Sequence, residues 1–154
     1  MPGSAEVPEE SPCNATAMRK ATRRMTQLYD NALAPAGLRS TQYAILEELH
    51  RQADAPPTMG ELAETLVLDR SALGHNLRPL ERDGLIALVA DDNDRRTRRV
   101  VLTTRGRAKF AQGKRAWKSA QDRFNDVFGE SAGAKLRATM LRIARDERLA
   151  TLTD

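Results

Sequence analysis

The stretch that decides the fold is "LDRSALGHNLRPLERDGLIALVADDNDRRTRRVVLT", residues 68–103. In its first part, leucines including Leu73 and Leu77 recur at the spacing of one helix face, and Asp69 and Gly84 stand where a helix can be capped and ended. In its second part, "LIALVA" and "RVVLT" are short apolar runs typical of strands, and an arginine-rich segment separates them. The stretch therefore predicts a helix followed by an antiparallel hairpin whose loop is too long for a tight turn.

Three helices are predicted before this stretch. Thr58 and Glu61 in "TMGE" form a capping box, in which a side chain and a backbone amide satisfy each other reciprocally at the start of a helix. Ser40 can cap an earlier helix, which "ADAPP" stops. The first helix is expected over residues 15–34, where apolar residues recur at alternating three- and four-residue steps.

Two further helices are predicted after the hairpin. Thr103 or Thr104 begins a long one, in which Phe110, Trp117 and Phe124 recur every seven residues, and "GESAG" separates it from the last helix. A chain this small has too little surface to cover such an apolar seam, which indicates a dimer; the alternative is packing within the chain. The predicted fold is mainly α with a small β-hairpin.

Composition narrows the class of protein. Lys and Arg exceed Asp and Glu by 25 to 21, and residues 95–121 hold ten Lys or Arg and no acid. Such a run indicates a polyanionic partner such as nucleic acid, and a solvated helix face is the alternative. We find no apolar run for a membrane span and no signal peptide. A single Cys and two His argue against a disulfide, a metal site or a bound cofactor. The expected location is therefore the cytoplasm, with residues 1–13 as a disordered tail.

Two helices joined by a short turn and followed by a hairpin describe a winged helix-turn-helix, whose second helix enters the DNA major groove. A turn of 100° per residue places one set of side chains opposite the leucine face, and these are the candidate base contacts. That set is Ser71, His75, Arg78 and Arg82, flanked by Arg70 and Gly74. The alternative interpretation is a plain solvated helix face.

The loop of the hairpin carries four arginines beside an aspartate. Guanidinium groups at a hairpin tip can pair with phosphates or enter the narrow minor groove, and Asp94 can hold a neighbouring guanidinium in place. A solubilising loop is the alternative, but it does not explain arginine rather than lysine at one end only. The candidate wing contacts are Asp94, Arg95, Arg96, Arg98 and Arg99.

At this point the chain resembles the MarR family of bacterial winged-helix regulators. The resemblance is carried by "RRMTQLYDNALAPAGLRSTQYAIL", "LDRSALGHNLRPLERDGLI" and "DDNDRRTRRVVLTTRG", with the family's D-x-R wing element on Asp94 and Arg96, and it extends from residue 14 onward. It implies a homodimer with interlocked N- and C-terminal helices on an inverted-repeat operator in double-stranded DNA. Gly74 and His75 replace the Thr-Arg frequent in relatives, so the operator sequence is not carried over.

The resemblance also offers an alternative mode of regulation, in which oxidation of a cysteine controls DNA binding. Peroxide sensors of the family use a cysteine near the start of the first helix, held by tyrosines that match Tyr29 and Tyr43. Cys13 lies two positions too early, and Ala15 stands at the sensing position. A helix N-terminus lowers a thiol pKa, whereas the acidic tail disfavours the thiolate. Thiol sensing is therefore the alternative, and an inert Cys13 is preferred.

The favoured interpretation is a sequence-specific regulator, a repressor released by a small aromatic or carboxylate effector, and not an enzyme. The effector is expected between the dimer helices and the DNA-binding lobe, against Tyr29 and Tyr43 with Arg19 or Arg23. A third hypothesis is a helical protein whose basic hairpin binds an acidic protein or RNA. The expected organisation is a helical dimerisation region over 14–38 and 105–150 and a DNA-binding region over 39–104.

Overall fold

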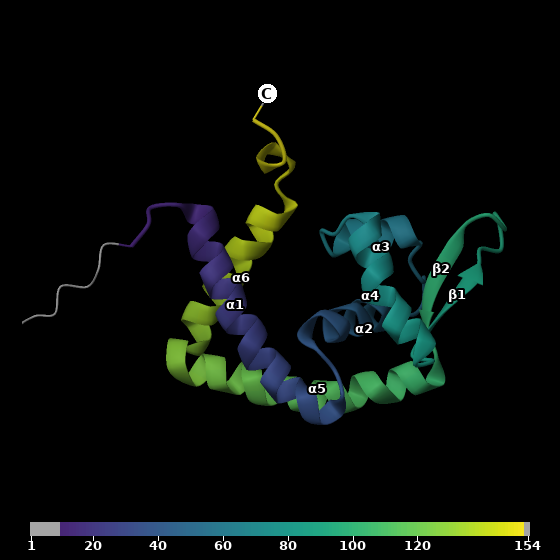
Figure 1. Ribbon diagram of the computed structural model, residues 1–154, viewed down its shortest axis with the longest axis horizontal. Helices are drawn as coiled ribbons and strands as arrows, with labels where there is room; N and C mark the ends of the chain where they lie inside the picture. Colours follow the sequence, from purple (N-terminus) through teal and green to yellow (C-terminus); the bar gives the residue numbers. More distant parts are fainter. Residues whose placement is uncertain (1–9, 153–154) are drawn as a thin grey trace, which may run out of the picture.

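The computed structural model describes residues 10–152 of the chain, and it is built mainly of helices (Figure 1). The elements are α1 (Asn14–Leu33), η1 (Ala34–Ala36), α2 (Ser40–Arg51), α3 (Met59–Thr65), α4 (Arg70–Arg82), β1 (Ile86–Ala90), β2 (Arg98–Leu102), α5 (Thr104–Phe128), α6 (Glu130–Arg145) and η2 (Glu147–Leu149). This confirms the predicted mainly helical fold with one hairpin. Of the predicted tail, residues 1–9 lie outside the described part of the chain.

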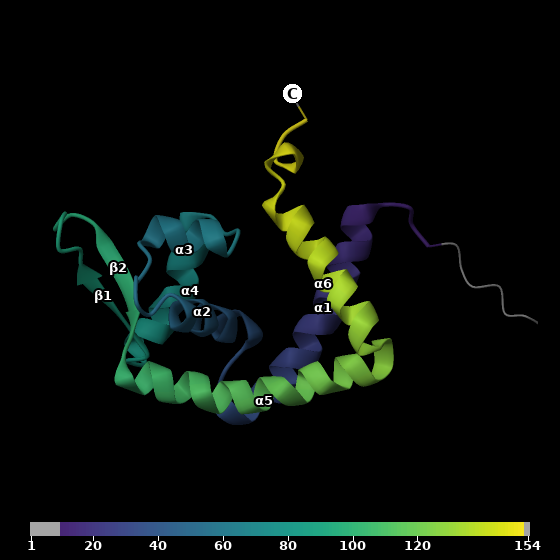
Figure 2. The same ribbon diagram turned by 180° about the vertical axis from the view of Figure 1, so that it is seen from behind.

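Helix α5 spans the whole molecule (Figure 2). At one end, α1 and α6 both pack on α5 and cross each other in the view of Figure 1; at the other, α2, α3, α4 and the hairpin form a compact lobe that carries the candidate DNA-binding residues. We refer to these two ends as the helical arm and the lobe. Within residues 10–152, no helix combines the length and apolar character that crossing a bilayer requires.

The predicted helix caps explain where three helices begin. Thr58 donates its backbone N–H to Glu61 Oε2 at 2.8 Å, and the Glu61 N–H donates to Thr58 Oγ1 at 3.2 Å, which confirms the capping box of α3. Asp69 Oδ1 accepts the Ala72 N–H at 2.7 Å at the start of α4. Thr103, rather than Thr104, is the N-cap of α5.

The cap of α2 differs from the prediction. Ser40 is the first residue of α2 and not its cap, and Arg39 takes the N-cap position. The Ser40 N–H donates instead to Asp30 Oδ1 at 2.7 Å, so a carboxylate on α1 satisfies an amide that the helix leaves open. The start of α2 is therefore capped by this carboxylate of the preceding helix together with a local side chain other than Ser40, because Gln42 Oε1 accepts the Arg39 N–H at 3.0 Å.

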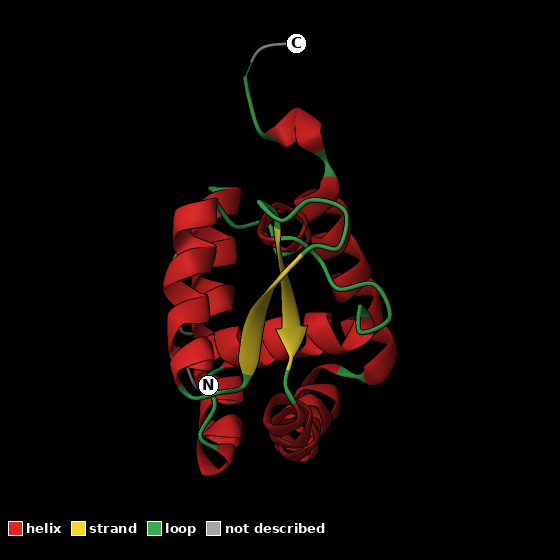
Figure 3. Ribbon diagram, turned by 90° about the vertical axis from the view of Figure 1, so that its right-hand side faces the viewer, coloured by secondary structure: helices red, strands yellow, loops and turns green. Residues whose placement is uncertain are grey.

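The hairpin pairs β1 with β2 antiparallel, with Ile86 opposite Leu102 and Ala90 opposite Arg98 (Figure 3). It is also joined to the segment before α3, because the Val100 N–H donates to the Pro57 carbonyl at 2.9 Å. A two-stranded hairpin alone is marginally stable in water, so this additional pairing contributes to its support.

The core lies in the lobe and is rich in leucine. Its fully buried members come from α1, α2, α3, α4 and β2, and include Leu33, Leu46, Leu62, Leu73 and Val100. Helix α5 completes this core from below: the ring of Phe110 stacks on Tyr43 with centroids 5.6 Å apart, and Trp117 stacks on Tyr43 at 6.2 Å. Phe110 and Trp117, the first two of the three aromatic residues that recur every seven positions, therefore pack within the chain.

Candidate nucleic-acid interface

Helix α4 has one buried and one exposed face. Leu73, Leu77 and Leu80 are buried, whereas the opposite face carries the residues predicted to meet DNA bases. Of these, Ser71, His75, Arg78 and Arg82 are exposed, as is Arg70, and Gly74 is half-buried. The structure thus brings the predicted residues together on one uncovered surface, and their contact with DNA remains a prediction.

Gly74 is not explained by packing within the chain. A β-carbon built there meets no atom within 4 Å, and the position lies inside a regular helix, where glycine is less stable than alanine. A surface without a side chain lets another molecule approach the helix backbone closely. Arg70 differs from its neighbours on α4, because its guanidinium reaches α3: a β-carbon at Gly60 would lie 3.2 Å from Arg70 Nη2.

The tip of the hairpin is closed by Asp94, but not in the way the sequence suggested. Asp94 Oδ1 accepts the backbone N–H of Arg96 at 3.0 Å, and Oδ2 accepts the Thr97 hydroxyl at 3.1 Å. The expectation that Asp94 holds a guanidinium is therefore wrong. The short aspartate side chain instead satisfies nearby groups of its own turn, as aspartates commonly do.

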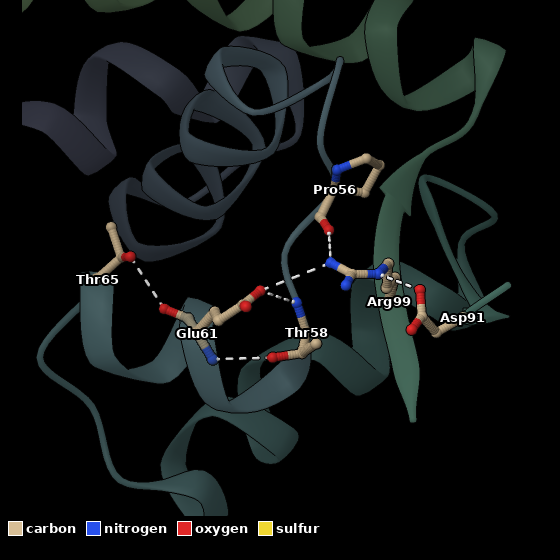
Figure 4. A network of polar contacts seen from close by, with 6 residues as sticks. All are labelled: Pro56, Thr58, Glu61, Thr65, Asp91 and Arg99. Carbon is tan, nitrogen blue, oxygen red and sulfur yellow. Dashed lines mark hydrogen bonds and ion pairs between the residues drawn. The ribbon is translucent and has the colours of Figure 1, made fainter. Parts of the chain in front are cut away.

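The carboxylate that does hold a guanidinium is Asp91 (Figure 4). Arg99 Nε donates to Asp91 Oδ1 at 2.8 Å, Nη1 donates to the Pro56 carbonyl at 2.6 Å, and Nη1 lies 3.7 Å from Glu61 Oε2. This hydrogen bond lowers the pKa of Asp91 and raises that of Arg99. We call these four residues the Arg99 network.

The four wing arginines therefore fall into two groups. Arg99 is half-buried and bonded to other segments of the chain, which the sequence did not reveal. Arg95, Arg96 and Arg98 are exposed at the tip and on β2. Because successive strand side chains point to opposite faces, Arg98 and Arg99 lie on different faces of the hairpin. The other three wing arginines have exposed guanidinium groups that a polyanion could contact.

A cavity of about 620 Å³ lies between α1, α5 and α6 in the helical arm. Its lining is mostly apolar, including Met25, Phe124, Leu136 and Met140, and two of its polar members, Tyr29 and Gln121, meet across it. The Tyr29 hydroxyl donates to Gln121 Oε1 at 2.6 Å. Burial raises the pKa of Tyr29, and the nearby charge of Arg137 acts in the opposite direction.

The structure brings only one of the four predicted effector residues to this cavity. Tyr29 lines it, whereas Tyr43 is 4% exposed and belongs to the core of the lobe, where desolvation raises its pKa to about 12. Arg19 and Arg23 are exposed on α1 and do not line it. The arginines at the cavity are Arg24 and Arg137, which sequence reasoning missed.

Cys13 is exposed at the N-cap position of α1. The hydroxyl and backbone N–H of Thr16, followed by the Ala15 N–H, lower the pKa of its thiol. This direction agrees with the effect expected of a helix N-terminus and is opposite to the one expected of the nearby acids. In the part of the chain that the structure describes, no three His, Cys, Asp or Glu side chains gather as a metal site.

Comparison with known proteins gives consistent results. A model of the MarR family matches residues 36–97. The transcriptional activatory protein BadR of Rhodopseudomonas palustris is 35% identical over 104 residues, which is 66% of this chain but only 55% of BadR. The chain thus spans about half the length of that relative.

Solved structures match over more of the chain. The M. tuberculosis transcriptional regulator MosR in complex with DNA is 30% identical with a TM-score of 0.79, over 91% of this chain and 99% of MosR. The transcriptional repressor CouR bound to a 23-mer DNA duplex is 27% identical with a TM-score of 0.78, over 86% of this chain and 93% of CouR. CouR from Rhodococcus jostii RHA1 bound to p-coumaroyl-CoA shares the fold at 22% identity with a TM-score of 0.77, over 96% of this chain and 100% of CouR.

Proposed function

Because the chain belongs to the MarR family of transcriptional regulators, we propose that it binds an inverted-repeat operator in double-stranded DNA as a homodimer and regulates transcription there. The observation that carries this proposal is the uncovered polar and basic face of α4 beside three exposed wing arginines. The DNA complex of MosR, which shares 30% of its residues with this chain, supports it.

In this arrangement α4 enters the major groove and the wing lies over the adjacent backbone and minor groove. Side chains on the exposed face of α4 reach base edges: Arg78 can bond a guanine bidentately, and His75 can donate or accept. Gly74 leaves room for the DNA to approach. At the wing, Arg95, Arg96 and Arg98 contact phosphates or the minor groove, where guanidinium groups are favoured electrostatically.

The homodimer would use the helical arm. Large apolar side chains stand exposed at the end of α5 and along α6, which is unusual for a surface that stays in water. They are Val127 at 64%, Phe128 at 60%, Leu141 at 45%, and Leu136 and Met140 at 40% exposure. A second copy related by twofold symmetry would cover this surface and place two α4 helices on one face. Four of these five residues, all but Val127, also line the cavity of the helical arm, so the partner would border that cavity.

The regulator is proposed to be a repressor that a small aromatic or carboxylate effector releases. The cavity of the helical arm supplies both kinds of recognition: ring surface from Phe124 and Tyr29, and positive charge from Arg24 and Arg137. In the dimer, an effector changes DNA binding only if it binds more tightly to one spacing of the two DNA-binding lobes than to another. The cavity suits such a ligand because Ser40, the first residue of α2, also lines it.

The test of DNA binding is selection of sites from a random duplex library by the purified protein. The expected result is an inverted repeat with half-site centres separated by roughly one helical turn. Duplex RNA of equal length and charge serves as the control for a nonspecific polyanion. Equal affinity for the RNA and for the selected DNA would reject the proposal in favour of a helical protein with a basic surface.

The effector is tested on the selected operator with a panel of aromatic acids. Arg137→Gln is expected to abolish release by an active acid, whereas Arg142→Gln, on the same helix but outside this cavity, retains it. The lowered pKa of Cys13 favours a second candidate, thiol-based control. Release by organic peroxide that disappears in Cys13→Ser, with no acid active, would establish that alternative.

A further inference from the structure

We propose that Arg99 is a positioning residue for DNA binding, which fixes the wing at a set distance from α4 without touching DNA itself. The inference rests on the proposed function. It concerns the Arg99 network, which joins β2, the start of the wing loop, the segment before α3 and the first turn of α3 (Figure 4).

The contacts of Arg99 come from three separate parts of the chain. Asp91 belongs to the wing, the Pro56 carbonyl to the α2–α3 connection, and Glu61 to α3. A planar guanidinium holds several acceptors at fixed mutual angles, which a lysine ammonium cannot do. The side chain therefore acts as a rigid connection between the wing and the first helix of the helix-turn-helix.

Backbone contacts reinforce the connection at the same place. Arg99 forms a β-bridge with Thr58, and the next N–H, of Val100, donates to the Pro57 carbonyl at 2.9 Å. Thr58 is itself the N-cap of α3. The wing is thus attached at the residue where α3 begins, and because α3 and α4 pack together, its orientation relative to α4 is set there.

Two features keep Arg99 from serving as a phosphate contact. Its Nε and Nη1 are already used, and its side chain is 32% exposed. The carboxylates of Asp91 and Glu61 also lie beside it and would repel a phosphate. Arg98, on the other face of the same strand, has neither restriction and remains available for DNA.

The purpose of such a residue is pre-organisation. A hairpin that moved freely would have to be immobilised each time DNA bound, which would weaken the affinity. With its base held by Arg99 and its tip closed by Asp94, the wing already has one geometry in the free protein. Removing Arg99 should therefore weaken binding without removing a phosphate contact.

The first arm of the test uses the free protein. Hydrogen exchange of backbone amides in the wing loop, residues 91–97, is measured in the wild type, in Arg99→Met and in the matched variant Arg98→Met. Exchange should become roughly tenfold faster in Arg99→Met, because hydrogen bonds to charged groups are lost, and should not change in Arg98→Met. Unchanged exchange in Arg99→Met would overturn the proposal.

The second arm titrates operator binding with salt. Arg98→Met should lower the slope of log K against log salt by about 0.9, as expected for one lost phosphate contact. Arg99→Met should keep the wild-type slope while binding roughly tenfold more weakly at every salt concentration. Arg99→Lys should resemble Arg99→Met, since charge alone does not restore the network. A slope reduced by about 0.9 in Arg99→Met would make Arg99 a direct DNA contact.

The outcomes separate the two proposals. A wild-type protein that binds no duplex rejects the proposed function, and the role of Arg99 in DNA binding with it. Wild-type binding that Arg99→Met leaves unchanged rejects the role of Arg99 alone. If Arg99→Met does not fold, Asp91→Asn removes the charge of the nearer carboxylate partner and keeps the arginine bonded to Pro56. It should produce faster wing exchange and weaker binding at an unchanged slope, and failure to do so overturns the proposal.

Discussion

A β-carbon on Gly106 would lie 1.9 Å from the carbonyl oxygen of Leu85, so α5 passes the base of the hairpin at backbone contact distance. The same carbonyl accepts the Thr103 N–H at 3.1 Å, and the Thr103 hydroxyl donates to the Gly84 carbonyl at 2.6 Å. The start of α5 is thus bonded to the short connection between α4 and β1. Any side chain at residue 106 would separate them.

Substituting Gly106 and Gly74 by alanine should give opposite effects on stability. Gly106→Ala should lower the free energy of unfolding by about 1–3 kcal/mol, because the new methyl group overlaps backbone that cannot move away easily. Gly74→Ala should raise it by about 0.5–1 kcal/mol, since the position is open and alanine favours the helix. Urea unfolding measures both. Equal destabilisation would mean that Gly74 has a packing role.

The same Gly74→Ala variant is informative for DNA binding. If α4 enters the major groove as proposed, a methyl group on its exposed face should weaken operator binding even though the protein is more stable. Operator affinity measured beside the unfolding curve separates the two effects. Unchanged affinity would place the DNA away from this part of α4.

Arg95→Ala and Arg96→Ala should each reduce the dependence of DNA binding on salt. A lost phosphate contact lowers the slope of log K against log salt by about 0.9. Lys118→Ala provides the control, since Lys118 is paired with Asp122 at 2.6 Å on α5 and lies outside the proposed interface. Slopes that match the control in both wing variants would remove the tip from the contact surface.

Substitutions of His75 and Arg78 should change which operators are preferred. Each good base contact accounts for about 1–3 kcal/mol of discrimination between base pairs. The measurement is binding to a panel of single-base operator variants, compared with random duplex. An equal loss on all sequences would instead identify these residues as backbone contacts.

A charge introduced into the apolar surface of the helical arm should disrupt the proposed dimer. Leu141→Glu is expected to shift the protein from dimer to monomer in analytical ultracentrifugation, because a carboxylate would be buried without a partner. Val67→Glu is the matched control, since Val67 is 63% exposed but lies on the lobe. A dimer that survives Leu141→Glu would place the interface elsewhere.

Alkaline titration should distinguish the two tyrosines. Tyr43, with a pKa of about 12, should ionise above the usual value of about 10. Because the folded state holds this proton more tightly than the unfolded state, stability is retained below pH 10 and declines as pH rises toward 12. Ultraviolet absorbance at 295 nm follows ionisation, and Tyr43→Phe should remove the last step. A tyrosinate step near pH 10 that vanishes in this variant would contradict the buried position.

The features that could be predicted from the sequence are those decided locally. The capping box of Thr58 and Glu61 and the cap at Asp69 depend on residues three positions apart, and the structure confirms them. The exposed face of α4 follows from helical periodicity alone. Tyr43 could also have been assigned to the core, because it precedes Leu46 and Leu49 at helical spacing.

What escaped prediction depends on how distant segments meet. Asp91, rather than Asp94, binds Arg99 because the strand register places Asp91 diagonally across from it, and composition does not fix that register. The cavity residues Gln121 and Arg137 face Tyr29 only once α1, α5 and α6 have come together. The cap of α2 likewise required the turn that brings Asp30 back to Ser40.

The bond between Asp30 and Ser40 has a consequence for attempts to cut the protein into modules. A fragment that began at Arg39 would lose the carboxylate that satisfies the first turn of α2, together with Leu33 and Leu38 from the core. A fragment that ended before Phe110 would lose the ring against which Tyr43 stacks. The lobe therefore depends on α1 and α5 for part of its core and for the cap of α2. Engineered DNA-binding domains taken from this chain should retain α1 and the first half of α5.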